Sequence, residues 1–173
     1  MMQTKTTIIS LSILSIMFFT QCCGTFEDDK LSLPLRPYVG NQLQVAGYYY
    51  CEKLSQGYAF YRNGVILELG GGYYSINELE ENLIKYYNEP SLLNHKYRWG
   101  IFIIEGHNIK FERLYPGNIN WAAFIREGVI LNDTTFHITK SYRSNGTEHR
   151  AKDEIYRFRR FSPKPDSTNN FIR

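Results

Sequence analysis

The adjacent cysteines Cys22 and Cys23 are the residues whose type and position most clearly indicate a chemical reaction. Lys5 places a positive charge near the start of the chain, and an apolar run over residues 8–19 follows it. A run of this length is too short for a bilayer core of about 30 Å, which takes about 20 residues as a helix, so we expect a cleaved export signal. A cysteine at such a cleavage point accepts a diacylglyceryl group on its thiol. The pattern therefore predicts lipidation of Cys22, with Cys23 as the alternative site.

Cleavage before Cys22 would remove residues 1–21 as a lipoprotein signal peptide. Residues 22–41 would then hold the lipidated cysteine, an acidic segment and a flexible tether, because Pro34 and Pro37 interrupt any regular periodicity. Stable anchoring takes two or more acyl chains, and mature bacterial lipoproteins carry two or three, so we expect this end of the chain to bind a membrane. Plain secretion after cleavage at a small residue is the alternative.

An acidic run at residues 27–29 lies five to seven positions after Cys22. With this run the signal resembles those of Bacteroidetes-type lipoproteins, in which acidic residues shortly after the lipidated cysteine mark export to the outer face of the outer membrane. The stretches 132–140 and 156–171 are also similar to uncharacterised lipoproteins of this kind. The resemblance implies an outer-membrane lipid anchor and display at the cell surface, and it implies no activity. A solvated acidic linker is the alternative interpretation of the run.

The other residues of reactive type form no catalytic motif in the sequence. There is no Gly-x-Ser-x-Gly nucleophile elbow, and Cys51 has no local partner motif. The four histidines, which show no metal-ligand spacing, are His95, His107, His137 and His149. The carboxylates that a glycoside hydrolase could pair in a cleft are Glu68, Glu105, Glu112 and Asp133. We therefore expect no enzyme activity, no cofactor and no metal, and a hydrolase is the weakest functional alternative.

Aromatic residues are the most unusual feature of the composition, at 16% of the chain, with 14 Tyr, 11 Phe and 2 Trp. Tyrosine and phenylalanine favour half-buried pleated surfaces, so β-structure and core packing explain most of them. Exposed rings can also stack on sugars or lipid headgroups. The aromatic candidates for binding a glycan or lipid ligand are Tyr48, Tyr50, Tyr73, Tyr74 and Trp121.

The length and charge of the chain indicate one domain without a polyanionic partner. Removing 21 of the 173 residues leaves 152, enough for a single hydrophobic core. Loss of Lys5 with the signal lowers the formal net charge from +3 to +2, and the only basic block is 157–160, so we expect no nucleic-acid binding. Cys51 is expected as a small buried hydrophobe, with a disulfide to Cys23 as the alternative.

Strand patterns dominate residues 42–161, the predicted domain, and a tail follows at 162–173. The strongest hairpin signal is Asn63-Gly64 between the apolar runs 58–62 and 65–69. A two-residue loop there predicts that Phe60 pairs with Leu67. Further strands are expected, and their ranges are 43–51, 99–105, 109–114, 119–126, 129–131, 134–142 and 153–161.

A capping box at Ser75 and Glu78 predicts one helix over about 75–87, inserted after the third strand. The side chains expected on its apolar face are Ile76, Leu79, Leu83, Tyr86 and Tyr87. Eight or nine short strands must close or cover their edges. We therefore predict a mainly β protein, a small antiparallel meander barrel or half-barrel that resembles the calycin or lipocalin architecture. Its expected function is non-catalytic binding of an unknown ligand at the cell envelope. The alternative is a structural or accessory interaction protein, or an enzyme inhibitor.

Overall fold

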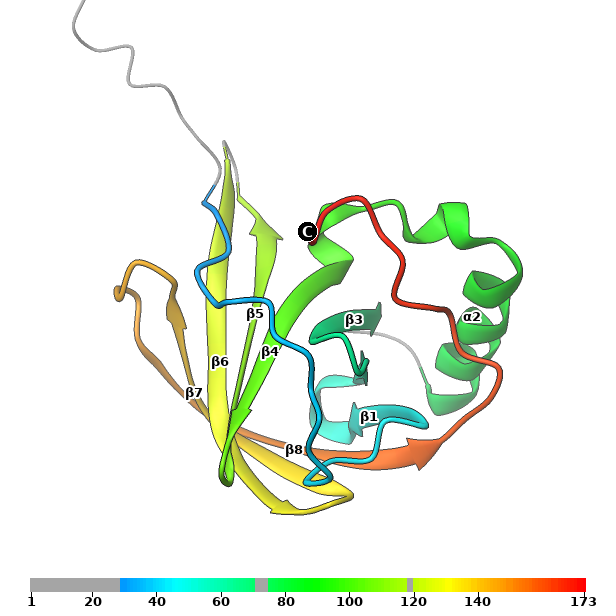
Figure 1. The fold of residues 1–173 in the computed structure, drawn as a ribbon, viewed down its shortest axis with the longest axis horizontal. Coiled ribbons are helices and arrows are strands. Elements are labelled where there is room, and N and C mark those ends of the chain that lie inside the picture. The colour runs from blue at the N-terminus through cyan, green and yellow to red at the C-terminus, as the bar shows by residue number, and fades with distance from the viewer. Residues whose placement is uncertain (1–28, 71–74, 118–119) are drawn as a thin grey trace, which may run out of the picture.

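Eight antiparallel strands close into a barrel in the computed structural model, which describes residues 29–70, 75–117 and 120–173 (Figure 1). They are β1 (Gly47–Cys51), β2 (Gln56–Phe60), β3 (Val65–Gly70), β4 (Trp99–Glu105), β5 (Asn108–Pro116), β6 (Trp121–Asn132), β7 (Thr135–Arg143) and β8 (Arg150–Arg160). Each strand pairs with the next along the chain, and β8 pairs with β1. This confirms the predicted meander barrel. The predictions for the signal peptide, Cys22, Cys23, Tyr73 and Tyr74 lie outside the described residues.

The predicted strands 119–126 and 129–131 are one continuous strand, β6. The register against β7 shifts between Glu127 and Gly128, which marks a bulge. A Cβ atom on Gly128 would collide with the carbonyl oxygen of His137, so glycine lets the two backbones approach at this point. Gly128, which lies between the two predicted strands, is therefore part of a bulge inside one continuous strand.

The β2–β3 hairpin differs from the prediction by one residue, because Phe60 pairs with Ile66 and not with Leu67. The cause is the turn. Gly64 N donates to the carbonyl oxygen of Tyr61 at 3.0 Å, and Gly64 itself has a φ of +86°. The loop therefore has three residues and ends in a left-handed glycine, the second most common hairpin geometry.

A one-residue slip exchanges the two faces of a strand pair. Ile66 therefore shares a face with Phe60, where the predicted pairing would have put Leu67. Ile66 packs inside the barrel with Tyr58 and Phe60, whereas Val65 and Leu67 pack on the outside.

Aromatic rings fill much of the barrel interior. Phe136 stacks on Tyr156 with ring centroids 4.9 Å apart, and Phe60 meets Phe102 edge-on, also at 4.9 Å. The buried residues of this interior are Tyr38, Leu43, Tyr49, Cys51, Tyr58, Phe60, Ile66, Phe102, Ile109, Phe111, Ile130, Phe136, Ile138 and Tyr156. Cys51 is buried and has no disulfide, as expected for a small buried hydrophobe. Such a packed interior leaves no room there for a long acyl chain.

Helix α2 (Ile76–Asn88) lies outside the barrel and covers β1–β3 (Figure 1). The predicted capping box forms, since Ser75 Oγ accepts from Glu78 N and Glu78 Oε2 accepts from Ser75 N at 2.7 Å. Leu79 and Leu83 are fully buried against the sheet. Three short 3-10 turns accompany the helix in the described chain, at Glu52–Leu54 (η1), Pro90–Leu93 (η2) and Lys96–Arg98 (η3).

The buried face of α2 is narrower than predicted. Leu79, Leu83 and Tyr86 follow the spacing i, i+4, i+7, which places Tyr87 at the flank, where it is 50% exposed. Glu80, which is not part of the predicted apolar face, accepts a hydrogen bond from the Tyr48 hydroxyl at 2.6 Å. The helix therefore contacts the sheet through an acidic residue as well as its apolar stripe.

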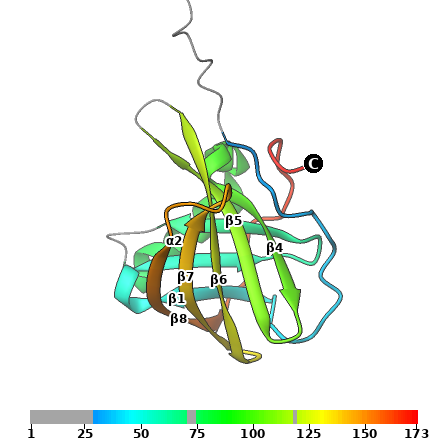
Figure 2. The ribbon, with the colours of Figure 1, turned by 90° about the vertical axis from the view of Figure 1, so that its left-hand side faces the viewer.

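The segment before β1 is packed on the barrel from Asp29 onward, which corrects the expectation of a flexible tether over 29–41 (Figure 2). Both Ser32 N and Leu33 N donate to Glu112 Oε2 at 2.7 Å, and Tyr38 is buried among the interior residues. These contacts outweigh the irregular periodicity around the two prolines. The chain from Asp29 is therefore part of the folded domain.

The C-terminal segment also packs, across the outer layer between α2 and the barrel (Figure 1). The Tyr61 hydroxyl donates to the carbonyl oxygen of Pro165 at 2.8 Å. Lys164 Nζ donates to the carbonyl oxygens of Val45 and Phe60 at 2.7 and 3.1 Å. The predicted tail thus closes the second apolar cluster.

Candidate ligand-binding site in the barrel lumen

One half of the lumen, towards the β5–β6 and β7–β8 connections, is lined by polar side chains. Strand alternation explains their position, because Arg113 and Tyr115 continue the inward face of β5 that begins with Ile109 and Phe111. We call this set the polar lumen cluster, and its members are Gln56, Tyr58, Glu68, Arg113, Tyr115, Arg126, Glu154 and Tyr156.

The Arg126–Glu154 pair forms one side of the polar lumen cluster. Arg126 Nη1 lies 2.6 Å from Glu154 Oε2, and it also donates to the Tyr156 hydroxyl at 3.0 Å. The Tyr156 hydroxyl in turn donates to Gln56 Oε1 at 3.1 Å. The two charged side chains are only 12% and 4% exposed. Charges this deep in a protein require partners, and here each has one.

The Arg113–Glu68 pair forms the other side. Arg113 Nη1 lies 2.8 Å from Glu68 Oε2. Gln56 Nε2 donates to Glu68 Oε1 at 2.9 Å, so this glutamine connects the two ion pairs. The Arg113 guanidinium lies between two rings, with its Cζ atom 5.2 Å from the Tyr58 centroid and 4.8 Å from the Tyr115 centroid. This geometry holds the plane of the guanidinium in place.

Two buried donors of the cluster have neither a hydrogen-bond acceptor nor an ion-pair partner among the described residues. Neither the Tyr58 hydroxyl nor Arg113 Nε has a hydrogen-bond partner in the described part of the chain. Tyr58 is fully buried and Arg113 is 3% exposed. A buried donor without an acceptor costs about 1–3 kcal/mol, and more when it is charged. An acceptor from outside the chain would therefore be favourable at this point.

The two arginines lower the pKa of two neighbouring acidic groups, whereas burial raises the pKa of Tyr58 and of Tyr156 in the same cluster. Burial acts to raise the pKa of Tyr115, but the charges of Arg113 and Arg126 outweigh it and hold that pKa below its usual range. Burial also acts to raise the pKa of Glu68, but the charge of Arg113 outweighs burial and lowers that pKa below its usual value. Burial acts against the charge of Arg113, yet the neighbouring Tyr115, Tyr58 and Glu68 raise its pKa above the usual value. Both arginines thus remain cationic in a largely buried site.

Two of the predicted binding residues, Tyr48 and Tyr50, lie on the outer face of β1 beneath α2 and the C-terminal segment. They are 1% and 7% exposed. Tyr48 packs edge-on against Phe161 with centroids 6.0 Å apart. Tyr49, between them, points into the lumen, as the alternation of side chains along a strand requires. Both side chains serve packing in this structure, and their binding of a ligand stays a prediction.

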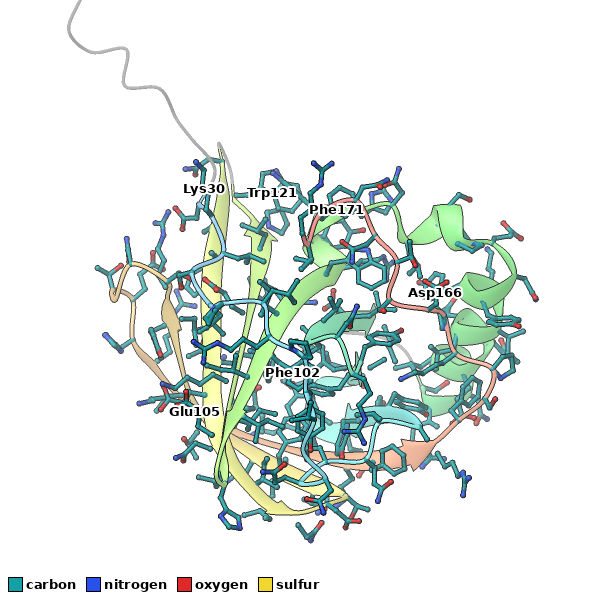
Figure 3. The ribbon with its side chains drawn as sticks, in the orientation of Figure 1. Lys30, Phe102, Glu105, Trp121, Asp166 and Phe171 are labelled. Carbon is teal, nitrogen blue, oxygen red and sulfur yellow. The ribbon has the colours of Figure 1, made fainter. Side chains whose placement is uncertain are left out.

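Trp121 is the predicted binding residue that lies at the surface, at the start of β6 (Figure 3). Its ring stacks on Tyr97 with centroids 5.9 Å apart and planes 6° from parallel. The ring of His95 also stacks on Tyr97, with centroids 5.4 Å apart. Lys96 Nζ lies 4.4 Å from the Trp121 centroid. The result is a short aromatic ladder with a cation beside it.

The four candidate carboxylates of a hydrolase lie in separate places. Glu68 belongs to the polar lumen cluster, whereas Glu112 faces outward, where the Ser144 hydroxyl donates to it. Glu105 lies at the β4–β5 turn, and Asp133 lies beside Asn132 at the end of β6. These four residues therefore form no facing pair in one cleft.

Within the described ranges, no group of three or more His, Cys, Asp or Glu side chains is arranged to hold a metal ion. In the same part of the chain, no helix combines the length and the apolar character needed to cross a bilayer.

Sequence reasoning did not identify Arg113, Arg126, Gln56 or Glu154 as site residues. A signal was present in β5, where the alternating positions 109, 111, 113 and 115 change from apolar to polar along one face. Arg126 and Glu154 come together from β6 and β8, which are not adjacent strands, so no local pattern could indicate their contact.

Comparisons with protein-family models, with curated proteins and with solved structures gave no match. The barrel is consistent with a calycin-like fold. A shared architecture of this kind carries no ligand with it, so a function must be argued from the site itself.

Proposed function

We propose that this chain is a lipid-anchored lipoprotein of the outer membrane, displayed at the cell surface, whose barrel binds a small acidic ligand in the polar lumen cluster without catalysis. The observation that carries the binding proposal is the pair of buried, unpartnered donors, the Tyr58 hydroxyl and Arg113 Nε. The signal pattern around Cys22 and the acidic run after it support the anchoring.

The chemistry of the cluster favours an anion over a neutral ligand. A guanidinium supplies planar donors that match the oxygens of a carboxylate or phosphate, and Arg113 already has this plane fixed between two rings. The neighbouring hydroxyl of Tyr58 supplies one further donor. An acidic group at this point would satisfy both orphan donors and would meet the field of two arginines.

The filled part of the lumen limits the size of the ligand. Phe60, Phe111 and Phe136 are almost completely buried next to the cluster, and they occupy the space below it. A long lipid tail would have to displace these rings, which cost about 3–5 kcal/mol each to lose from a packed core. The ligand class is therefore a small acid, such as an acidic sugar or a short carboxylate, and not a fatty acid held lengthwise.

Native mass spectrometry of the full chain, purified gently and followed by solvent extraction, tests the proposal. We expect a co-purified acidic mass, and we expect the Arg113→Met variant to lose it. Arg157→Met is the matched control, because Arg157 is an exposed arginine on β8. A chain that is free of ligand, and that neither inorganic phosphate nor citrate stabilises against heat, would contradict acidic-ligand binding.

The alternative is an accessory protein that binds another envelope component through its surface. A groove of about 450 Å³ between the N-terminal and C-terminal segments favours this reading, since Leu31, Leu33, Leu35 and Phe171 contribute to its lining. Capture of a defined partner that the Leu33→Asp variant no longer binds would favour this function over ligand binding.

A further inference from the structure

The position of Asp29 limits how far the barrel can lie from a lipid on Cys22. Asp29 N donates to the carbonyl oxygen of Trp121 at 2.8 Å, and Asp29 Oδ2 accepts from Ala123 N at 3.0 Å. Six residues, 23–28, separate this fixed point from Cys22. Fully extended, that connection spans about 25 Å at most.

This reach is shorter than the barrel strand on which Asp29 is docked. β6 has 12 residues and is therefore about 40 Å long. Asp29 docks at its first residue, Trp121, so the connection cannot carry the opposite end of β6, at Asn132, to the membrane that holds the lipid. Docking through the Asn132 end is therefore excluded, whereas the end of the barrel at the β5–β6 connection lies within reach of the bilayer.

The side chains at that end suit the interface between water and lipid. Trp121 and Tyr97 form the stacked ladder described above, and Lys96 lies beside it. Tryptophan and tyrosine are enriched where a membrane meets water, because their rings combine an apolar body with a polar edge. Lys30 is exposed immediately after Asp29, and Figure 3 shows it at the same edge of the molecule as Trp121 and Phe171.

The groove between the two terminal segments continues this surface. Its lining combines leucines of the N-terminal segment with Phe171 and Ile172, and three cations, Lys30, Lys96 and Arg173, belong to the same lining. The negative charge of Asp29 at this end is compensated, because Arg143 Nε lies 2.8 Å from its Oδ2 atom. Apolar side chains bordered by lysine and arginine match the acyl and phosphate layers of a lipid surface.

We infer that the β5–β6 end of the barrel docks on the lipid headgroups of the membrane that carries the anchor. Trp121 and Tyr97 lie at the headgroup level, and Lys30, Lys96 and Arg173 contact lipid phosphates. This inference rests on the lipidation of Cys22 in the proposed function and deepens it. The polar lumen cluster lies in the half of the barrel nearest this end, so its ligand binds close to the membrane surface.

The chain has only two tryptophans, and this makes the inference measurable. Trp99 is 2% exposed, and Trp121 is partly exposed at the proposed interface. The full lipidated chain is reconstituted in vesicles of phosphatidylethanolamine and phosphatidylglycerol, with and without brominated acyl chains, which quench indole fluorescence only at short range. We expect the brominated lipid to remove about half of the wild-type emission. The emission of the Trp121→Phe variant comes from Trp99 alone and should be unaffected by the brominated lipid.

Three controls make the outcomes separable. The Trp121→Phe variant should keep the thermal midpoint of the wild type, since Trp121 lies outside the core. Cys22→Ala should no longer float with the vesicles, and a variant that floats as well as the wild type would overturn the lipidation and the docking together. If the wild-type chain floats but its emission resists the brominated lipid as fully as that of Trp121→Phe, the docking is wrong and the anchoring stands.

Discussion

Asp29 and Arg143 lie 114 positions apart in the chain and form a two-pronged ion pair at one end of the barrel. Arg143 Nε donates to Asp29 Oδ2 at 2.8 Å, and Arg143 Nη2 donates to Asp29 Oδ1 at 3.0 Å. Both side chains are about one quarter exposed. This contact holds the start of the described chain on β6 and β7. Only six residues, 23–28, then separate the docked Asp29 from Cys22.

We expect the docking of Asp29 to weaken in acid. The hydrogen bond from Arg143 lowers the pKa of Asp29 below its usual value, so the pair stabilises the docked segment above about pH 4. That stabilisation is lost as the pH falls through the lowered pKa, because the folded chain must then take up a proton. Hydrogen exchange at Ala123 N, corrected for intrinsic rate, should show protection falling in acid. The Asp29→Asn variant should show weaker protection and no such pH dependence.

The Arg113–Glu68 pair should respond asymmetrically to the loss of either partner. Arg113→Met leaves Glu68 buried without its cation and should cost about 3–5 kcal/mol of unfolding free energy, measured by urea denaturation. Glu68→Gln keeps the cation and frees its donors. We expect this variant to bind citrate more tightly than the wild type, although it is less stable.

A variant at an exposed arginine distinguishes the loss of a positive charge from the loss of the buried ion pair. Arg157→Met removes the same charge from the outside of β8 and should change the unfolding free energy by less than about 0.5 kcal/mol. Equal effects of Arg113→Met and Arg157→Met would show that the buried pair contributes nothing specific.

Gly64 and Gly146 allow the turn and its packing to be tested separately. Their φ angles are nearly equal, at +86° for Gly64 and +82° for Gly146. A Cβ on Gly64 would collide with the carbonyl oxygen of Arg36, whereas a Cβ on Gly146 would meet nothing within 4 Å. Gly146→Ala should therefore cost only the left-handed backbone penalty, about 1–2 kcal/mol.

Gly64→Ala should cost measurably more in the same thermal or urea unfolding experiment, because it also displaces the segment at Arg36 from the hairpin. If the two alanine variants lose the same amount of unfolding free energy, the N-terminal segment at Arg36 does not pack against this turn.

Lys164 should make the protein more stable as the pH rises above neutral. Burial lowers the pKa of its ammonium group to about 8. An unfolded lysine has a pKa of about 10.4, so between these values the unfolded chain binds more protons and the free energy of unfolding increases with pH. The thermal midpoint should therefore rise from about pH 8 to about pH 9. Tyr61 opposes this effect only at about pH 10, because burial raises its pKa above the usual value and the unfolded chain then loses the tyrosine proton first.

The Lys164→Met variant is the control for this pH dependence, and its thermal midpoint should vary less over the same range. Parallel curves for the wild type and the variant would show that Lys164 keeps its proton when folded, held by the carbonyl oxygens of Val45 and Phe60.

Local patterns predicted the elements of this fold well. The capping box at Ser75 and Glu78 placed the helix within one residue, and the predicted strand 99–105 has the bounds observed for β4. Helix caps and strand alternation depend on residues only a few positions apart in the chain, so they can be predicted from the local sequence.

The sequence by itself determined the strand order and the helix between β3 and β4, and it predicts an export signal over residues 1–21. Only the tertiary structure decided that Asp29 binds Arg143 and that the buried pairs of Arg113 and Arg126 share the lumen. The physical reason is distance along the chain. Contacts over 28 to 114 residues form only when the barrel closes, and closure also decides which donors, such as the Tyr58 hydroxyl, are left for a ligand.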